Sequence, residues 1–257
     1  MVILGISGKK QSGKNTTANY IHGCILKNKG LVEDFHITPK GELSILTADS
    51  LGNSGWGVLD ITRKDAGFVD YAERNMWPYV KLYSFADGLK RICVEFFGLQ
   101  PGQVYGTNEE KDTPTHLFWK DMPYAKDQQW MINAGADKHM TSREFMQYFG
   151  TNVMRQMHGS IWVDHAIDMI QREQTELAIV ADVRFPNEVE AVQKAGGRVI
   201  RLTRGKLKDS HDSEVALDKD NYDWKNFDAV IDNSQGDVQD CCADLHEVLF
   251  NYTVDWR

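Results

Sequence analysis

The chain has 257 residues, of which 42% are hydrophobic and 26% are charged, as is usual for a globular protein. Its 29 lysines and arginines against 37 aspartates and glutamates give a net charge of −8, which argues against non-specific nucleic-acid binding through a broad basic face. The apolar runs are too short to cross a bilayer and no cleavable apolar signal opens the sequence, so we expect no membrane contact and a cytoplasmic location. The four cysteines have no metal-site spacing, and we expect them to be reduced.

A phosphate-binding pattern follows the first apolar run, residues 2–6. Residues 7–17 read Ser-Gly-Lys-Lys-Gln-Ser-Gly-Lys-Asn-Thr-Thr, and a helical pattern continues from there. A strand, a glycine loop and a helix in this order form an anion site from main-chain N–H groups and the positive helix end. Gly8 and Gly13 let the main chain approach phosphates, and we expect Lys14 to reach the β- and γ-phosphate oxygens.

One position departs from the usual pattern. Asn15 stands where Ser or Thr commonly coordinates magnesium, so Thr16 and Thr17 are the neighbouring hydroxyls that could replace it. The alternative, a glycine-rich turn that binds nothing, is disfavoured because strand, loop, lysine and helix all agree.

The first half of the chain predicts a helix, a hairpin, a strand and a second helix. The helix runs from Thr16 to about Lys29, and residues 35–38 and 42–47 flank a Pro-x-Gly turn that predicts a β-hairpin. Residues 48–80 predict a loop-rich insert. A strand at 81–86 precedes a helix that Asp87 is expected to cap. The polar and aromatic stretch 99–140 predicts either a segment that closes over a ligand or a solvated excursion.

The second half alternates helices with buried strands. A capping box at 141–144 predicts a helix as far as Met157, and a further helix begins at Ser160. Strands are predicted at 177–182, 198–203 and 228–232, a helix from Pro186, and a last helix over about 238–251. Counted with residues 2–6 and 81–86, these give five strands separated by helices, which predicts a parallel sheet with helices on both faces.

Charged residues follow several of these strands, at the edge where parallel sheets bind ligands. Asp182 is placed to hold magnesium, or alternatively to cap the next helix. Arg184 could grip a substrate phosphate, or pair with Glu188 or Glu190. Arg204, with Lys206 and Lys208, predicts a basic lid over the reacting phosphates, although a basic loop is more often simply solvated. His211, Ser213 and Glu214 imply no nucleophilic triad.

Arg143, Gln147 and Arg155 are spaced by four and eight residues on the helix that begins at the capping box. An arginine pair with an amide between suits an anionic ligand that carries a base. Surface ion pairs with Glu144 or Asp164 are the alternative, and Gly150 with Thr151 is expected to bend the helix.

Taken together, these stretches resemble the phage-type deoxynucleoside monophosphate kinases of the P-loop nucleotide kinase superfamily. The matching segments occur in the family's order and are scattered over most of the chain, apart from residues 31–80. They are residues 7–17, 85–90, 143–151 with Arg155, 182–188 and 211–214.

The resemblance implies transfer of the ATP γ-phosphoryl group to a (deoxy)nucleoside monophosphate, with Mg²⁺. On this reading Lys14, Arg184 and Arg204 are catalytic, and Asp182 and Thr16 hold the metal. The ATP-binding residues are Gly8, Lys9, Ser12, Gly13, Lys14, Asn15 and Thr16. The acceptor-binding residues are Asp87, Lys90, Arg143, Gln147 and Arg155.

The expected fold is a three-layer α/β P-loop NTPase fold with a five-stranded parallel sheet, an inserted hairpin and a lid. We expect a single domain over 1–257, with the insert at about 31–80, the acceptor-binding region at about 87–160 and the lid at about 204–226. The partners are nucleotides, with neither nucleic acid nor membrane, and a homodimer is left open. The alternative functions are a P-loop kinase of another small metabolite and a non-catalytic nucleotide-binding protein.

Overall fold

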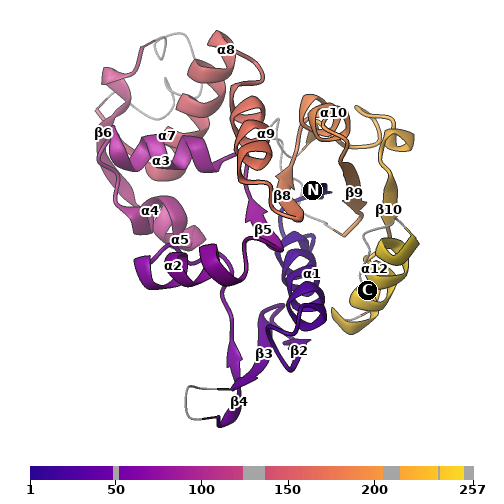
Figure 1. Ribbon diagram of the computed structural model, residues 1–257. Coiled ribbons are helices and arrows are strands. Elements are labelled where there is room, and N and C mark those ends of the chain that lie inside the picture. The colour runs from indigo at the N-terminus through magenta and orange to yellow at the C-terminus, as the bar shows by residue number, and fades with distance from the viewer. Residues whose placement is uncertain (49–51, 124–136, 205–214, 237, 252–257) are drawn as a thin grey trace. The chain divides into compact units, whose positions relative to one another are not determined.

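The computed structural model describes residues 1–48, 52–123, 137–204, 215–236 and 238–251. The chain divides into two compact units (Figure 1). The first unit combines Met1–Ser84 with Ala166–Arg257, and the second unit is the intervening Phe85–His165. No helix in the described part of the chain is both long enough and apolar enough to span a membrane.

The first unit is built on a five-stranded parallel sheet. Its strands are β1 (Val2–Ser7), β5 (Val80–Tyr83), β8 (Leu177–Val183), β9 (Arg198–Leu202) and β10 (Ala229–Ile231). The order across the sheet is β10-β9-β1-β8-β5. The chain therefore adds β5 and β8 on one side of β1 before it adds β9 and β10 on the other. Ligands of parallel sheets bind at the carboxyl ends of the strands where this reversal occurs. The predicted five-stranded parallel sheet is confirmed.

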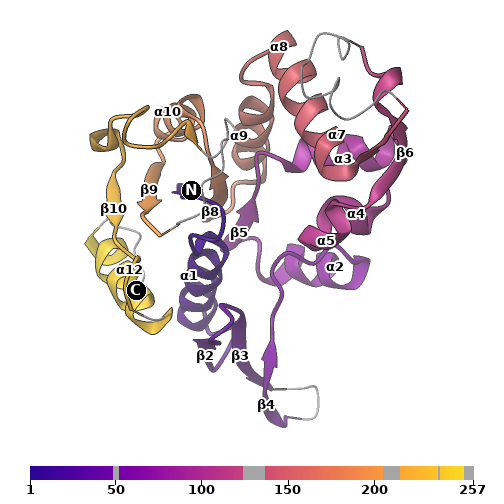
Figure 2. The same ribbon diagram turned by 180° about the vertical axis from the view of Figure 1, so that it is seen from behind.

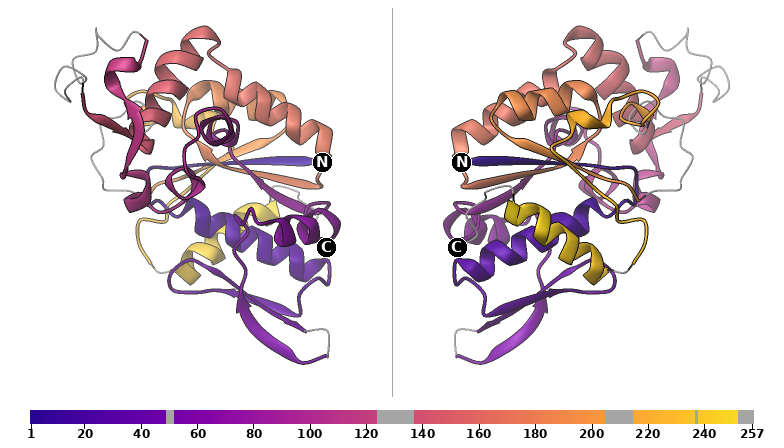
Figure 3. Two further views of the ribbon diagram at one scale, coloured as in Figure 1. Left: turned by 90° about the vertical axis from the view of Figure 1, so that its left-hand side faces the viewer. Right: turned by 90° about the vertical axis from the view of Figure 1, so that its right-hand side faces the viewer.

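Helices cover both faces of this sheet. α1 (Lys14–Asn28) and α12 (Val238–Asn251) lie on one face, and α10 (Pro186–Lys194) lies on the other (Figure 3). The strands are short apolar runs because both of their faces are buried: Ile6 and Ile179 expose none of their surface. The predicted α/β architecture is therefore confirmed. The 3₁₀ turn η4 (Trp224–Asn226) precedes β10.

The insert forms an antiparallel sheet beside α1, visible from both sides in Figures 1 and 2. β2 (Asp34–Ile37) and β3 (Leu43–Ala48) form the predicted hairpin, and β4 (Ser54–Val58) pairs with the far side of β3. The expectation of a loop is wrong for β4. All five of its residues are exposed and two are glycines, so it lacks the alternation of buried and exposed side chains that marks a strand.

The same expectation is wrong for α2 (Ala66–Asn75). The Asp65 carboxylate caps this helix by accepting a hydrogen bond from the Phe68 N–H at 3.1 Å. Phe68, Ala72 and Met76 recur every four residues, and all three belong to the core of the first unit. The capping aspartate and this spacing were present in the sequence, and they outweigh the glycines that precede them.

The second unit has its own apolar core. Its members are Cys93, Leu99, Val104, Trp119, Met140, Phe145 and Tyr148. The residues from 99 onward thus contribute core side chains, and only part of the stretch 99–140 fits a solvated excursion; Tyr124 and Trp130 lie outside the described residues. The elements of this unit are α3 (Asp87–Glu95), α4 (Pro101–Tyr105), α5 (Asn108–Lys111), β6 (Pro114–Phe118), η1 (Trp119–Asp121), β7 (His139–Thr141), α7 (Ser142–Gln147), η3 (Tyr148–Met154), α8 (Arg155–Met157) and the start of α9 (Ile161–Glu173).

The helix expected over 142–157 is interrupted by the π-helix η3. The Gly150 carbonyl accepts the main-chain N–H of Arg155, five residues on, and also the indole N–H of Trp162 at 3.1 Å. A Cβ at Gly150 would lie 2.7 Å from Leu89 Cδ2, so the wide turn forms where α3 packs closely. Since the turn is wider than an α-helical one, the α-helical spacing between Gln147 and Arg155 no longer applies.

Candidate active site

The loop after β1 needs its two glycines for different reasons. At Gly8 the reason is space, because a Cβ there would lie 2.3 Å from the Oγ of the fully buried Ser12. At Gly13 the reason is conformation, because its φ of +96° is in the left-handed region. Gln11 also has a positive φ, of 62°. The loop therefore curls tightly before α1 begins at Lys14.

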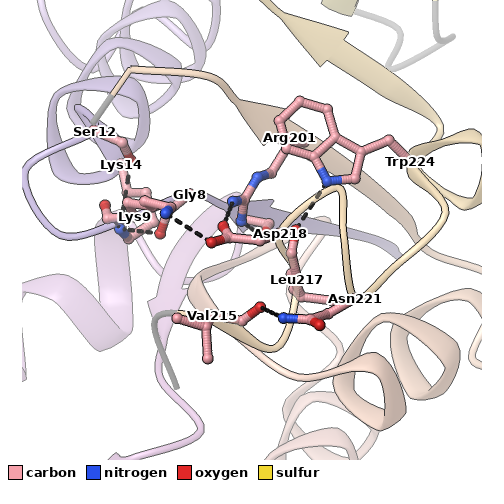
Figure 4. A network of polar contacts seen from close by, with 11 residues as sticks. Gly8, Lys9, Ser12, Lys14, Arg201, Val215, Leu217, Asp218, Asn221 and Trp224 are labelled. Atoms are coloured by element: carbon pink, nitrogen blue, oxygen red, sulfur yellow. Dashed lines mark hydrogen bonds and ion pairs between the residues drawn. The ribbon is translucent and has the colours of Figure 1, made fainter. Parts of the chain in front are cut away.

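Lys14 lies folded over this loop. Its side chain is 8% exposed, and Nζ donates to the carbonyl oxygens of Gly8 and Lys9 at 2.6 Å each (Figure 4). The pKa of Lys14 is lowered to about 7, mainly by burial and also by the positive charges of Arg184 and Arg201, while Asp182 acts in the opposite direction. The ammonium is thus held inside the loop at a cost that a negative ligand would relieve.

A buried arginine that the sequence analysis missed stands beside the loop. Arg201 in β9 is 4% exposed and donates to the Ser7 Oγ at 2.9 Å. Its other terminal nitrogen lies 3.7 Å from the Asp218 carboxylate, and this carboxylate also forms an ion pair with the Lys9 Nζ at 2.8 Å (Figure 4). The sequence could have revealed Arg201, because it is a charged residue near the carboxyl end of a predicted buried strand. Lys9, predicted to bind ATP, is paired with Asp218 here.

Asp182 and Arg184 lie at the carboxyl end of β8. The Asp182 carboxylate accepts a hydrogen bond from the Ser84 hydroxyl at 2.6 Å. It does not cap α10, whose N-cap is Phe185, so the capping alternative is wrong. The main-chain N–H of Arg184 donates to the Glu188 carboxylate at 2.7 Å. Both charges act on the pKa of Lys14, which places them around the phosphate-binding loop.

The remaining predicted residues of the first unit occupy different surroundings. Asn15 is exposed. A Cβ at Gly41 would lie 2.3 Å from the Thr16 Oγ1, so this hydroxyl faces the turn between β2 and β3. Arg204 is exposed, and its main-chain N–H donates to the Asn233 side chain at 2.8 Å. Lys206, Lys208, His211, Ser213 and Glu214 lie outside the described residues.

The predicted acceptor-binding residues all lie in the second unit. Asp87 is the first residue of α3 and Ala86 is its N-cap, so the expectation that Asp87 caps the helix is wrong. Gln147 is exposed at the end of α7, and Arg155 follows the π-helix. The guanidinium of Arg143 donates to Asp112 at 2.6 Å and to Asn108 at 2.9 Å. Arg143 thus forms an ion pair, as the alternative expected, but with Asp112 in place of Glu144 or Asp164.

Arg143 belongs to a group of cations in this unit. The pKa of Lys111 is lowered first by burial and then by the positive charges of Lys90 and Arg143. The Lys90 Nζ also lies 5.5 Å from the centre of the Tyr105 ring. The carboxylates of Glu110 and Asp112 act on the pKa of Lys111 in the opposite direction, and an anion bound beside these cations would stabilise the charge of Lys111. Lys111 was missed by the sequence analysis because α5 is short and lies in a stretch broken by prolines.

Comparisons with known proteins show the family of the chain. The sequence profile of the family described as deoxynucleotide monophosphate kinase matches residues 103–241. The chain belongs to this family. It is 31% identical over 166 residues to a protein of Acanthamoeba polyphaga mimivirus named "Putative deoxynucleotide monophosphate kinase", a match that covers 59% of this chain and 74% of the relative. It is 26% identical over 235 residues to the deoxynucleotide monophosphate kinase of Enterobacteria phage T4, covering 84% of this chain and 88% of the relative.

Family membership confirms the resemblance stated from the sequence, and with it the prediction that the protein is a kinase that uses nucleotides.

Proposed function

We propose that the protein transfers the γ-phosphoryl group of ATP to the phosphate of a deoxynucleoside monophosphate. An oxygen of the acceptor phosphate bonds to the γ-phosphorus and the bond from that phosphorus to the β–γ bridging oxygen breaks, which gives ADP and a deoxynucleoside diphosphate. Such a reaction needs positioning and charge stabilisation rather than a covalent intermediate. The observation that carries the proposal is the buried Lys14 ammonium inside a tight glycine loop, in a chain of this family.

The donor residues of the proposal lie around the loop after β1. Main-chain N–H groups of residues 8–16 bind the ATP phosphates, including those of Gly8, Ser12 and Gly13. Lys14 moves from the carbonyls of the loop to the β- and γ-phosphate oxygens and stabilises the charge on the transferred group. We assign Arg184 and Arg204 to stabilise the same charge on the transferred group, since guanidinium groups pair with phosphates in two parallel hydrogen bonds.

The metal in this proposal is Mg²⁺, which arrives with ATP and neutralises charge on the phosphate oxygens. Mg²⁺ is commonly held by one or two carboxylates together with substrate phosphates. The Asp182 carboxylate fits this requirement, because it lies near Lys14 and is oriented by the Ser84 hydroxyl. The Thr16 hydroxyl faces Gly41, so its part in binding the metal requires a change of rotamer.

The acceptor residues of the proposal are Asp87, Lys90, Arg143, Gln147 and Arg155. We assign the acceptor phosphate to the cation group of Lys90, Lys111 and Arg143. The support is the effect of the Lys90 and Arg143 charges on Lys111, whose pKa they lower, and the fixed orientation of the Arg143 guanidinium by Asp112 and Asn108. The exposed Gln147 amide offers both a donor and an acceptor to a base.

A coupled assay of ADP formation tests the proposal with a panel of deoxynucleoside and nucleoside monophosphates. ADP should form only when an acceptor is present, and the diphosphate product should appear in equal amount. Lys14→Met should lower the rate by about three orders of magnitude or more without changing the circular dichroism spectrum. ATP hydrolysis at a rate that does not depend on the acceptor would contradict the proposal. Turnover with an unrelated metabolite and with none of the nucleoside monophosphates would contradict it as well.

A further inference from the structure

The side chain of Asn233 connects two separate parts of the first unit. Asn233 follows β10 and is 3% exposed. Its Nδ2 donates to the main-chain carbonyl of Ser12 at 2.7 Å, and its Oδ1 accepts the main-chain N–H of Arg204 at 2.8 Å. Because one partner is a carbonyl and the other an N–H, only this orientation of the amide satisfies both. Neither contact was expected from the sequence.

The contact with Ser12 matters because of how a phosphate-binding loop is built. The carbonyl and the N–H of one peptide group point in opposite directions, so a fixed Ser12 carbonyl also fixes the direction of the Gly13 N–H. The Asn233 amide lies directly against this peptide group, since a Cβ at Gly13 would be 3.4 Å from Nδ2. At a φ of +96° Gly13 has the rotational freedom that such a restraint has to remove.

The other carbonyls described for the loop are held from nearby in the sequence. The Gly13 carbonyl accepts the N–H of Thr17, and the Lys9 carbonyl accepts the N–H of Ser12. The Ser12 carbonyl instead receives its partner from a residue 221 positions away. This contact therefore makes the loop depend on the correct placement of the ends of β9 and β10.

The same side chain also joins the loop to Arg204, two residues after the end of β9. The neighbouring contacts reinforce the junction: the Thr203 N–H donates to the Ile231 carbonyl at 3.1 Å, and the Thr203 hydroxyl donates to the Asp232 carboxylate at 2.6 Å. Asp232 is exposed, and its carboxylate accepts hydrogen bonds from the Thr203 hydroxyl and the Ser234 N–H. It thus offers a matched control for Asn233.

We propose that Asn233 is a positioning residue for ATP, which holds the Ser12–Gly13 peptide group in the orientation that a triphosphate requires and links it to the main chain of Arg204. This inference rests on the proposed function, because it concerns the same donor site. In this proposal Asn233 does not touch ATP itself. Its effect passes through the peptide group that does, so its loss should weaken the binding of ATP and leave the acceptor unaffected.

Asn233→Asp is the sharpest test because it preserves size and one oxygen. The retained oxygen still accepts the Arg204 N–H, while the second oxygen faces the Ser12 carbonyl without a proton to donate. We expect the KM for ATP, and the Kd for ATP measured by calorimetry without acceptor, to rise about tenfold or more, as for a lost buried hydrogen bond. The KM for the deoxynucleoside monophosphate should change by less than about twofold.

Two further variants keep the result interpretable. Asp232→Asn retains an oxygen for Thr203, so its ATP affinity should stay within about twofold of that of the unmodified protein. Asn233→Ser introduces no buried charge, shortens the side chain and should weaken ATP binding in the same direction, which keeps the test available if Asn233→Asp does not fold.

An unchanged ATP affinity in folded Asn233→Asp would overturn the inference, as would an equal rise in both KM values or failure of both Asn233 variants to fold. If the unmodified protein binds ATP but transfers no phosphoryl group, the proposed function fails, and the calorimetric comparison still decides the role of Asn233.

Discussion

Binding of ATP should draw a proton onto the protein, because Lys14 titrates near neutrality in the free loop. Burial is the main cause that lowers its pKa to about 7, and the charges of Arg184 and Arg201 add to it. At pH 8, one unit above that pKa, about nine in ten molecules carry the neutral amine, whereas at pH 6 about one in ten do. The negative triphosphate favours the ammonium and returns the pKa toward its ordinary range.

The expected uptake by Lys14 is thus about 0.9 proton for each ATP bound at pH 8 and about 0.1 at pH 6. The affinity for ATP should fall by about tenfold for each pH unit above 7, because the amine must then be protonated on binding. Calorimetric titrations in two buffers with different protonation enthalpies measure the uptake directly.

Lys14→Met is the control, since it removes the titrating group and leaves Arg201 and Asp182 in place. Protons taken up or released by the nucleotide itself remain in the variant, so the difference between the two proteins isolates Lys14. Equal uptake by both proteins, or a difference that does not grow between pH 6 and pH 8, would refute the reasoning. The ammonium would then be charged in the free loop despite its burial.

The remaining predictions concern stability and the acceptor. His22 is buried, its Nδ1 donates to the Ala18 carbonyl, and burial lowers its pKa to about 4. As the pH falls, the histidine of the unfolded chain is therefore protonated before that of the folded protein. About 3 kcal/mol of the free energy of unfolding should be lost between a pH above 6.5 and a pH below 4. Urea unfolding of the protein and of His22→Asn at pH 8 and pH 4.5 should show this loss only where His22 is present. Gly23→Ala should lower the melting temperature, because its Cβ would lie 2.2 Å from the Phe35 ring. The cost of such overpacking, about 1–3 kcal/mol, exceeds the gain in helix propensity. In a Phe35→Ala background the same change should be neutral or stabilising. Arg143→Ala should raise the KM for the acceptor at least about tenfold, and a change in the KM for ATP alone would show that Arg143 has no part in acceptor binding.

The parts of the structure that local sequence determines could be predicted. The phosphate-binding loop is contiguous, and its glycines, lysine and following helix lie within residues 7–17. Strands of the parallel sheet such as β1 and β8 are apolar runs because helices bury both of their faces, so these two stand out from composition alone. The capping box at Thr141 formed as predicted, with the hydroxyl accepting the Glu144 N–H at 3.1 Å.

The parts that depend on distant contacts could not be predicted. β4 is an exposed edge strand with glycines at alternate positions, and pairing with β3 alone makes it a strand. The π-helix η3 depends on Leu89 and Trp162, which come from other helices. Asn233 looks like an ordinary residue after a strand until its two partners are known.

The site of the first unit has to keep its cations in place before any phosphate arrives. A buried cation without a partner destabilises a fold, and Lys14 and Arg201 are 8% and 4% exposed. The protein supplies neutral carbonyls to Lys14, whereas it supplies the Asp218 carboxylate to Arg201 and Lys9. Neutral partners can be given up to a triphosphate at a smaller electrostatic cost than a carboxylate. Lys14 is therefore the cation best placed to change partners during the reaction, and Arg201 the one best placed to remain fixed.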